Sequence, residues 1–446
     1  MRIIQPQAKL VPLVLGEQKL NTDKKYRMLS FCIRVKYKGN ELIFNNLTKE
    51  LLCLEKDEAG LLDAGIFDTD NPFVKTLVEK WFLVPVENDD VKLCDQLREV
   101  ALTFKDKSHI CNYNLVTTTA CNARCFYCFE AGAKVSTMSK ETALCAAKFM
   151  KENAKGKKIR VHWFGGEPLC NVAAINEVVK YFKENNVEFI SNITTNGYLF
   201  NQKNIAFAKE WNLQYAQITL DGLAETYNKV KSYVVKDENH FNTVINNIEN
   251  LLKADICVVV RLNMDSSNSV ELYALVDFLK ERFGQFKNFA VYVHLIYEKF
   301  GFVKSERSAN ERLSLEEKFF ALREYIEERL HYASKNILPQ DIKTSHCMAD
   351  SHNSMLISPD GNIGNCESFV DSKFYGHINT TKSVKVWDEY IKYSDCETCP
   401  CYPSCIRLKG CPNYDEVCHN YEKKENLLNI KKQIVDAFIK FFSKTV

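Results

Sequence analysis

The central part of the chain, from about residue 112 to residue 300, alternates short apolar runs with amphipathic stretches. The apolar runs predict six strands, at residues 114–118, 159–164, 188–194, 215–220, 257–263 and 290–295. Stretches such as 140–153, 172–184 and 241–253 repeat their apolar residues at helical spacing. Alternation of this kind predicts a parallel sheet with crossover helices. Six such units favour an α/β fold with a partial (β/α)6 TIM-like barrel, in which functional loops gather at the carboxyl ends of the strands.

The first 95 residues follow a different pattern, with shorter pieces and more turns. The predicted elements are, in order, a strand at 31–37, a turn at 38–40, a strand at 41–44, a helix that begins within 46–52, a helix at 71–80 and a strand at 81–86. This order predicts a winged-helix-like α+β domain over residues 1–95.

Three further segments follow the barrel. Residues 301–344 predict a charged helical bridge, with its helix at Leu315–Ala333. Residues 345–423 are rich in loops and cysteine, and hold too few apolar residues for a core of their own, so bound metal is expected to organise them. Residues 424–446 predict an amphipathic helix that packs on the body of the protein.

Charge and cysteine content narrow the class of protein. The 59 basic and 57 acidic side chains nearly cancel, which gives no support for a nucleic-acid partner. No apolar run reaches the roughly 18–20 residues of a membrane span, and residues 1–19 lack a signal-peptide pattern. We therefore expect a cytoplasmic protein without a membrane partner. Disulfides are rare in that compartment, so the 18 cysteines point to metal or redox use.

Cys121, Cys125 and Cys128 form a C-x3-C-x2-C run just after the first barrel strand. Zinc takes four ligands and prefers paired C-x2-C knuckles. Three thiolates on one loop can instead cap three irons of a 4Fe–4S cubane and leave the fourth iron open to a small molecule. The alternative is three unrelated buried thiols, because free cysteine is a frequent core residue.

Small polar groups and glycines follow the next three predicted strands. They are Gly165, Gly166 and Glu167 after the second strand, Thr195 and Asn196 after the third, and Thr219 and Asp221 after the fourth. Glycines let the backbone approach a ligand closely, and Glu167 with nearby amides could hold the amino group of an amino-acid-like ligand. Taken singly these strings are ordinary strand-to-turn transitions. As a series they predict a barrel mouth lined for a ligand.

Together these motifs resemble the radical SAM enzymes. The resemblance implies that Cys121, Cys125 and Cys128 hold a 4Fe–4S cluster whose open iron chelates S-adenosyl-L-methionine (SAM), and that an electron releases a 5′-deoxyadenosyl radical from it. Phe164–Pro168 is similar to the family's GGE motif, and Gln217–Gly222 to its SLDG segment, with Thr219 in place of serine. The residues implied to contact SAM are Tyr127, Gly165, Gly166, Glu167, Thr195, Asn196, Thr219, Asp221, Lys231 and Arg261.

Two cations compete for the SAM carboxylate. In the relatives an arginine follows the SLDG segment and pairs with that carboxylate. Lys231 occupies the matching position here, and it keeps the charge but loses the bidentate fork. Arg261, at the end of the fifth predicted strand, is its rival.

The C-terminal cysteines resemble the SPASM pattern, which holds two auxiliary 4Fe–4S clusters in radical SAM enzymes that act on peptides and proteins. The resemblance assigns Cys347, Cys366 and Cys411 to the nearer cluster, and Cys396, Cys399, Cys405 and Cys418 to the outer one. The family has three residues between the cysteines matching Cys405 and Cys411, where this chain has five, so Cys401 competes with Cys411. The alternative is a zinc-ribbon-like pair of knuckles.

Two further features bear on the substrate. Some relatives supply a fourth ligand to the nearer cluster from a cysteine shortly before the one that matches Cys347. This chain has no cysteine between Cys257 and Cys347, so the resemblance implies an open iron in the nearer cluster, which could bind a substrate thiolate. Glu367 follows Cys366, at the position where anaerobic sulfatase-maturating enzymes have an aspartate that acts as the base. Glu367 is therefore either the catalytic base or a solvated loop acid.

The N-terminal domain resembles the element with which maturases of ribosomally made peptides (RiPPs) grip the leader of a precursor peptide. An exposed strand edge there could pair with an added peptide strand, whereas the alternative is a structural cap on the barrel. We therefore predict a radical SAM/SPASM peptide maturase that forms a thioether to a peptide cysteine and takes its electron from an external donor such as flavodoxin or ferredoxin. The alternatives are a carbon–carbon cross-link, epimerisation, formylglycine formation on a sulfatase, and a non-catalytic zinc-stabilised peptide-binding protein.

Overall fold

A parallel sheet of six strands carries the central region. The strands are β7 (Asn112–Thr118), β8 (Ile159–Gly165), β9 (Phe189–Thr195), β10 (Leu213–Leu220), β11 (Cys257–Met264) and β12 (Phe289–Leu295), in the order β12-β11-β10-β9-β8-β7. The computed structural model describes residues 1–65, 67–236, 239–296, 309–333, 338–381, 383–412, 418 and 420–443. All six predicted strands are confirmed, and each pairs in parallel with its neighbour in the sequence.

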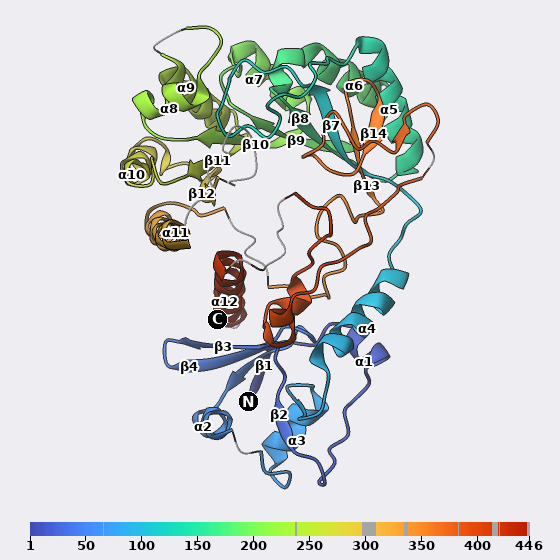
Figure 1. The fold of residues 1–446 in the computed structure, drawn as a ribbon, viewed down its shortest axis with the longest axis vertical. Coiled ribbons are helices and arrows are strands. Elements are labelled where there is room, and N and C mark those ends of the chain that lie inside the picture. The colour runs from blue at the N-terminus through green and yellow to red at the C-terminus, as the bar shows by residue number, and fades with distance from the viewer. Residues whose placement is uncertain are drawn as a thin grey trace. The chain divides into compact units, whose positions relative to one another are not determined.

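Helices connect these strands and cover the sheet (Figure 1). They are α5 (Lys140–Ala154), α6 (Val172–Glu184), α7 (Gln202–Glu210), α8 (Ala224–Lys231), α9 (His240–Lys253), α10 (Glu271–Phe283) and α11 (Ala309–Arg329). Their apolar faces are buried as the periodicity predicts; α9, for example, buries Val244, Ile248 and Leu251 completely. The parallel order with crossover helices brings all six carboxyl strand ends to one edge of the sheet.

The sheet continues beyond the six predicted strands. β13 (Ser354–Ile357) pairs in parallel with β7, and β14 (Asn362–Gly364) and β15 (Gly376–His377) follow in antiparallel order. In Figure 1 β13 and β14 lie beside β7. The sequence predicted only loops organised by metal in this region. The strands were missed because they are two to four residues long, too short for a periodic signal.

The structure divides into two compact units. The barrel unit comprises residues 107–333 and 347–387, and the terminal unit comprises residues 1–106, 334–346 and 388–446. Residues 345–423, predicted as one auxiliary domain, are therefore distributed over both units. The predicted boundary at residue 95 falls inside a helix, α4 (Asp90–Thr103).

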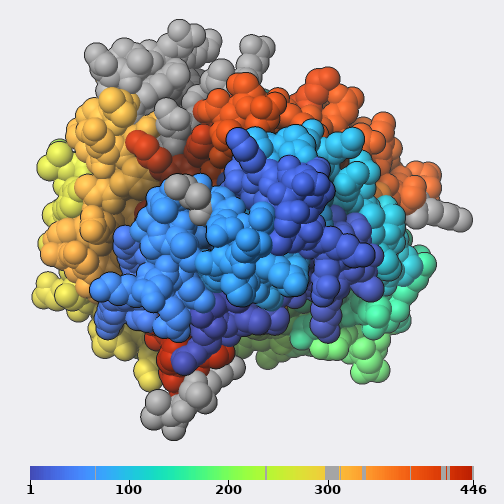
Figure 2. Space-filling model, turned by 90° about the horizontal axis from the view of Figure 1, so that it is seen from below, coloured from blue at the N-terminus to red at the C-terminus, as the bar shows by residue number. Residues whose placement is uncertain are grey.

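The terminal unit contains a four-stranded antiparallel sheet in the order β1-β5-β4-β3 and a separate β2–β6 pair. Its strands are β1 (Arg2–Gln5), β2 (Tyr26–Met28), β3 (Cys32–Tyr37), β4 (Asn40–Asn45), β5 (Leu51–Leu54) and β6 (Leu83–Pro85). Its first helices are α1 (Leu10–Val14), α2 (Lys56–Ala64), α3 (Pro72–Glu79) and α4. The hairpin at Lys38-Gly39 is confirmed, and both residues have positive φ. Figure 2 shows residues 1–100, in blue, as one continuous group of atoms.

The predicted helix start within residues 46–52 is wrong. Asn45 Oδ1 accepts hydrogen bonds from the backbone N–H groups of Leu47 (3.0 Å) and Thr48 (3.1 Å), and Lys49 has a φ of +66°. These contacts close a tight turn, after which β5 returns along β4. An asparagine that caps a turn uses the same side-chain-to-backbone bonds as one that caps a helix, so the local signal was ambiguous.

The last helix, α12 (Asn420–Ser443), belongs to the core of the terminal unit and confirms the predicted C-terminal helix. Its Ile430, Ile434 and Phe438 pack with Ile33, Leu42, Phe44 and Leu51 of the antiparallel sheet. Cys401 is buried in the same core. Short 3-10 turns, Ser394–Thr398 and Tyr402–Ser404, carry the cysteine-rich loop. Within the part of the chain that the structure describes, no helix combines the length and apolarity needed to cross a membrane.

Candidate active site

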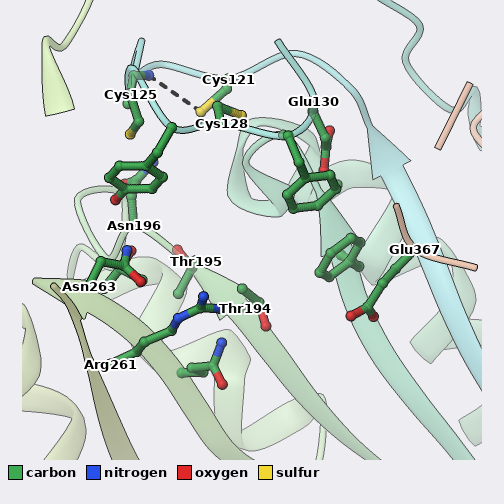
Figure 3. Close-up of a pocket in the computed structure, with 18 of the residues that line it drawn as sticks. Cys121, Cys125, Cys128, Glu130, Thr194, Thr195, Asn196, Arg261, Asn263 and Glu367 are labelled. Carbon is green, nitrogen blue, oxygen red and sulfur yellow. Dashed lines mark hydrogen bonds between the residues drawn. The ribbon is translucent and has the colours of Figure 1, made fainter. Parts of the chain in front are cut away.

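A cavity of about 470 Å³ lies at the carboxyl ends of the barrel strands (Figure 3). The three cysteines Cys121, Cys125 and Cys128 line it together with Glu367. Of the predicted SAM contacts, the following line it: Tyr127, Gly165, Gly166, Thr195, Asn196, Thr219, Lys231 and Arg261. The structure thus brings the main predicted groups of the barrel unit to one cavity. Glu167 and Asp221 are instead buried, and neighbouring groups occupy their carboxylates.

The cysteine loop is fixed by bonds to the ends of β9 and α8. Asn196 Nδ2 donates to Asn122 Oδ1 (2.7 Å), the Arg124 N–H donates to the Lys231 carbonyl (2.8 Å), and the Val234 N–H donates to the Asn122 carbonyl (2.8 Å). The loop therefore holds its thiols toward the cavity even though it has no regular secondary structure.

The surroundings of the thiols suit a cluster. Burial raises the pKa of Cys121 to about 12 and that of Cys128 to about 11, so both are neutral thiols until a metal displaces their protons. Among the described residues, no three His, Cys, Asp or Glu side chains converge as the ligands of a single metal ion do. A cubane binds each thiolate to a different iron, so its ligands stand apart. The three thiols of one loop fit that requirement.

The two glycines after β8 let this strand end approach the cysteine loop. Gly165 has a φ of +119°, and a Cβ there would lie 2.2 Å from the Thr118 carbonyl oxygen. A Cβ on Gly166 would lie 2.5 Å from the Ala120 oxygen. The Gly166 N–H donates to Thr118 O (3.0 Å). The glycines therefore allow a close contact of backbone with backbone at the base of the cysteine loop, and their predicted approach to a ligand stays a prediction.

Glu167 joins the second and third strand ends. Its carboxylate accepts from Thr195 Oγ1 (2.8 and 2.9 Å), from the Asn196 N–H (2.8 Å) and from the Leu169 N–H (3.1 Å). Burial raises the pKa of Glu167 to about 6, and these donors oppose the shift. Glu167 thus positions Thr195 and Asn196 at the cavity, and its direct contact with SAM stays a prediction.

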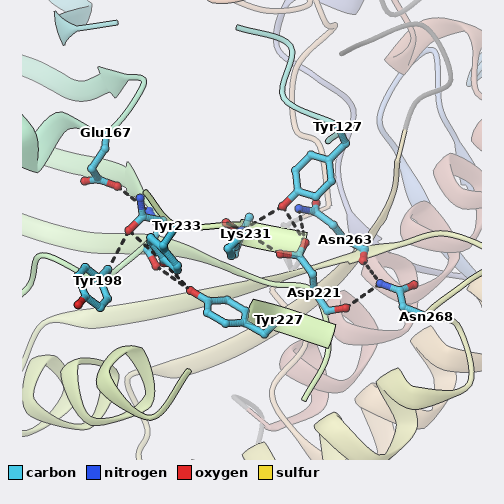
Figure 4. A network of polar contacts seen from close by, with 11 residues as sticks. Tyr127, Glu167, Tyr198, Asp221, Tyr227, Lys231, Tyr233, Asn263 and Asn268 are labelled. Atoms are coloured by element: carbon cyan, nitrogen blue, oxygen red, sulfur yellow. Dashed lines mark hydrogen bonds and ion pairs between the residues drawn. The ribbon is translucent and has the colours of Figure 1, made fainter. Parts of the chain in front are cut away.

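Lys231 lies in a buried polar network (Figure 4). Its ammonium contacts Asp221 Oδ2 (2.9 Å), Thr219 Oγ1 (2.9 Å) and Tyr127 OH (3.0 Å). Tyr127 OH donates to the other Asp221 oxygen (2.8 Å), which also accepts from Asn263 Nδ2 (3.1 Å). Burial works against the charge of Lys231, but Asp221 outweighs it and holds the pKa of Lys231 well above its usual value. All three N–H groups of this ammonium therefore have partners inside the protein.

Arg261 has a different environment. Its Nη2 donates to His294 Nδ1 (3.0 Å), and burial together with the Arg261 charge holds the pKa of His294 well below its usual value, so the ring is neutral. The Arg261 Nε is buried and has no partner among the described residues. Asn263 Oδ1, also at the cavity, is likewise buried and has no partner among the described residues. With Glu130 Oε2, which is also buried without a partner among the described residues, these atoms are polar groups at the cavity that a bound ligand could satisfy.

Two carboxyl groups line the cavity: Glu130, which lies two residues after Cys128, and Glu367, a residue exposed to solvent. Glu367 accepts from Asn114 Nδ2 (2.8 Å), and the protein around its carboxylate raises its pKa, against the opposing effects of Arg261 and Asn114. Glu130 was not predicted. Burial, with the charges of Asp371 and Glu367, raises its pKa to about 8. Its sequence signal was weak, namely an acid two residues after the last cysteine of the loop.

The C-terminal cysteines are distributed over both units. Cys347 and Cys366 belong to the barrel unit, and Cys396, Cys399, Cys405, Cys411 and Cys418 belong to the terminal unit. In the terminal unit Cys396 and Cys399 pack against a core that includes Phe31, Leu47 and Tyr402. The loop around them therefore uses the core of the N-terminal domain in place of one of its own.

Comparison with known proteins identifies the chemistry of the barrel. Residues 115–279 match the model of the Radical SAM superfamily. The Fe-coproporphyrin III synthase of Methanosarcina barkeri is 28% identical over 246 residues, which cover 54% of this chain and 57% of that protein. The chain thus matches little more than half the length of this relative.

Two solved structures share the fold more broadly. Native anSMEcpe with bound AdoMet and Cp18Cys peptide has a TM-score of 0.54 and 16% identity, covering 75% of this chain and 98% of that one. Streptococcus suis SuiB bound to the precursor peptide SuiA has a TM-score of 0.51 and 16% identity, covering 88% and 99%. At this identity the two structures establish the fold.

Residues 115–279 thus match a radical SAM domain, and this match supports an enzyme of radical-type chemistry. The superfamily implies one 4Fe–4S cluster and SAM, and the cavity holds the three cysteines that such a cluster needs.

Proposed function

We propose that this enzyme modifies a ribosomally made peptide, joining a peptide carbon to a cysteine sulfur as a thioether. One observation carries the proposal: the cysteine loop, Arg261 and Glu367 line the same cavity. The fold is shared with anSMEcpe and SuiB, whose structures contain bound peptides. The rival is a coproporphyrin-like substrate, because one relative is named for that reaction.

The cavity residues have different proposed roles in binding the cluster and SAM. When bound, the cluster and SAM would supply a 5′-deoxyadenosyl radical. Cys121, Cys125 and Cys128 hold the cluster, and Arg261 binds the SAM carboxylate through the Nε atom that has no partner among the described residues. Lys231 keeps Tyr127 and Asp221 in place. The protein thus orients a reactive cofactor, whose own chemistry carries the difficult step.

Glu367 is the proposed base for the substrate thiol. Its raised pKa makes it a better proton acceptor than an ordinary carboxylate, and Asn114 orients one of its oxygens. After a hydrogen atom has been removed from the peptide carbon by the 5′-deoxyadenosyl radical, thioether formation releases one proton and one electron. Glu367 takes the thiol proton at its carboxylate, and an auxiliary cluster would accept the electron. Glu130 is a second carboxyl group at the cavity, and burial with the charges of Asp371 and Glu367 raises its pKa to about 8.

The C-terminal cysteines are the proposed ligands of two auxiliary clusters. Cys396, Cys399, Cys405 and Cys418 lie within one unit, which supports their assignment to the outer cluster. The assignment of Cys347, Cys366 and Cys411 to the nearer cluster stays a prediction from the resemblance, as does its open iron.

The leader of the precursor is proposed to bind the terminal unit. β3 is an outer strand of the four-stranded sheet, so a peptide strand added there would gain main-chain hydrogen bonds. The α12 helix packs on the apolar face of this sheet, through contacts with Ile33, Leu42 and Phe44.

The test uses the full chain, reconstituted anaerobically with iron and sulfide and supplied with SAM and dithionite. The candidate substrates are short synthetic peptides that contain cysteine. We expect 5′-deoxyadenosine to form in a peptide-dependent manner, and the peptide to lose two hydrogens and one alkylatable thiol. The Cys121→Ala variant should lose both products, whereas Cys145→Ala, an exposed cysteine on α5, should retain them.

The other outcomes identify the rivals. Loss of two hydrogens with the thiol still open to alkylation indicates a carbon–carbon link, and an unchanged mass indicates epimerisation. Formylglycine gives an aldehyde that reacts with hydrazide probes. Turnover of coproporphyrin instead of peptide would overturn the proposal.

A further inference from the structure

A fully buried lysine lies against the cysteine-rich loop of the terminal unit. Lys49, in the turn between β4 and β5, is 0% exposed. Its ammonium donates to Asn46 Oδ1 (2.8 Å) and to Ser404 Oγ (3.2 Å), both neutral groups. No carboxylate of the described residues lies within ion-pair distance of it. By contrast, the nearby Lys80 ammonium pairs with Glu50 at 2.6 Å.

The turn that carries Lys49 is tied to the loop between two predicted cluster ligands. Asn46 Nδ2 donates to the Pro400 carbonyl (2.8 Å), and Ser404 Oγ donates to Asn46 Oδ1 (2.7 Å). Pro400 follows Cys399 and Ser404 precedes Cys405. The Lys49 ammonium is therefore part of the structure that supports the loop from Cys399 to Cys405.

Other cations gather at the same loop. Arg98 Nη2 donates to the carbonyls of Tyr402 (3.1 Å) and Cys405 (3.4 Å). The Arg407 guanidinium, two residues after Cys405, is 7% exposed and is bonded to Glu422. Lys49 differs from Arg407 because its buried charge is not balanced by a carboxylate partner.

A buried charge without a counter-ion is energetically unfavourable, and the pKa of Lys49 reflects this. Burial lowers the pKa of Lys49 to about 7, and Arg98 and Lys343 oppose the favourable effects of Cys94 and Asp341. An anion close to the loop would remove this cost. Four cysteine thiolates around a 4Fe–4S cluster carry net negative charge, and that charge is one of the factors that set the cluster's potential.

We propose that Lys49 is an electrostatic part of the outer cysteine site, where its buried ammonium stabilises the anionic group held by Cys396, Cys399, Cys405 and Cys418 and raises the reduction potential of a 4Fe–4S cluster bound there. The identity of the group rests on the proposed function. The role of Lys49 rests on its burial, its neutral partners and its bonds to the cysteine loop. The N-terminal domain thereby acts on the outer cluster as well as on the leader.

The test is a redox titration of the reconstituted full chain, followed by electron paramagnetic resonance. The outer-cluster signal is identified as the one missing from a Cys396→Ala/Cys399→Ala variant. In Lys49→Gln, which keeps an N–H donor and loses the charge, the potential of that signal should shift to more negative values. The barrel-cluster signal should be unchanged. Lys409→Gln, at an exposed lysine of the same unit that pairs with the exposed Glu389, should leave the outer potential unchanged.

Each outcome decides the role of Lys49. A normal iron content with an unchanged outer potential in Lys49→Gln would overturn the proposal and leave Lys49 as a tether. If Lys49→Gln loses the outer cluster while Lys49→Arg retains it, the charge is required; if both lose it, packing is the cause and the proposal fails. If the site takes zinc, it is the cluster assignment that fails. Faster loss of zinc to a chelator in Lys49→Gln than in Lys49→Arg then supports the charge role, and equal rates overturn it.

Discussion

At the scale of single residues, Lys231 and Arg261 separate into a structural cation and a ligand-binding one. Both line the cavity, and the sequence left them as rivals for the SAM carboxylate. The three N–H groups of the Lys231 ammonium bond to Asp221, Thr219 and Tyr127. The Arg261 Nε, by contrast, is buried and has no partner among the described residues.

This difference predicts two distinct phenotypes. Lys231→Met leaves Asp221 buried without its cation, so we expect the free energy of unfolding to fall by about 3–5 kcal/mol. Arg261→Gln should leave stability nearly unchanged and weaken SAM binding roughly tenfold or more, because a hydrogen bond to a charged group contributes about 1.5–3 kcal/mol. Denaturant unfolding measures the first, and equilibrium dialysis of SAM with the reconstituted enzyme measures the second.

The two effects also provide a control for each other. A Lys231→Met/Asp221→Asn double variant should recover part of the lost stability, since no unpaired charge then remains. The assignment would be reversed if Lys231→Met bound SAM weakly at full stability while Arg261→Gln bound it normally.

At the scale of elements, the end of β8 is built around a contact that tolerates no side chain. We expect Gly166→Ala to displace the base of the cysteine loop, because its Cβ would lie 2.5 Å from Ala120 O and 2.6 Å from Thr119 O, both backbone atoms. The barrel cluster should then be lost, which lowers the iron content by about four per chain. Iron and sulfide analysis after reconstitution measures this.

The matched control is Gly60→Ala. Gly60 lies within α2, and a Cβ there meets nothing within 4 Å. This variant should keep its iron, and it should be slightly more stable because alanine favours a helix over glycine. Full iron content in Gly166→Ala would show that the loop tolerates the displacement.

The sequence predicted most of the long, periodic elements and missed the short ones, and it also missed α4, a helix of 14 residues that crosses the predicted boundary at residue 95. The six barrel strands, α5, α6, α9 and α12 follow from apolar repeats, because tertiary packing only reinforces what the pattern favours. β5 was taken for a helix start, because the Asn45 turn uses bonds that resemble a cap. β13 was missed because its four residues become a strand only by pairing with β7.

The candidate site shows the same contrast between residues that a local pattern marks and residues that only tertiary structure brings together. Cys121, Cys125, Cys128 and Glu367 were found because motif spacing or position marks them. The partners of Lys231 come from the cysteine loop (Tyr127) and from the end of β10 (Thr219 and Asp221), and no local pattern records their meeting. Glu130 and Lys49 gain their significance from burial, which tertiary structure alone decides.

At the scale of the whole molecule, the two ends of the chain share one core. The terminal unit joins residues 1–106 to residues 388–446, and its core packs β3 and β4 with α12 and with Cys401. The outer cysteines therefore depend on a fold that is complete only when both ends of the chain are present. The barrel unit has its own continuous sheet and does not include this core.

This organisation predicts that damage to α12 removes one cluster and spares another. Ile434→Asp places a charge at a position that is 0% exposed, next to Ile33, Leu42 and Phe44, and so disrupts the core of the terminal unit. We expect the outer cluster to be lost, with iron falling by about four per chain, while the barrel cluster keeps its SAM-dependent electron paramagnetic resonance signal. Ile439→Asp, on the same helix at a residue that is 45% exposed, should keep all its iron. Retention of the outer cluster in Ile434→Asp would show that the cysteines hold it without the shared core, and loss of the barrel signal would show that the two units are not independent.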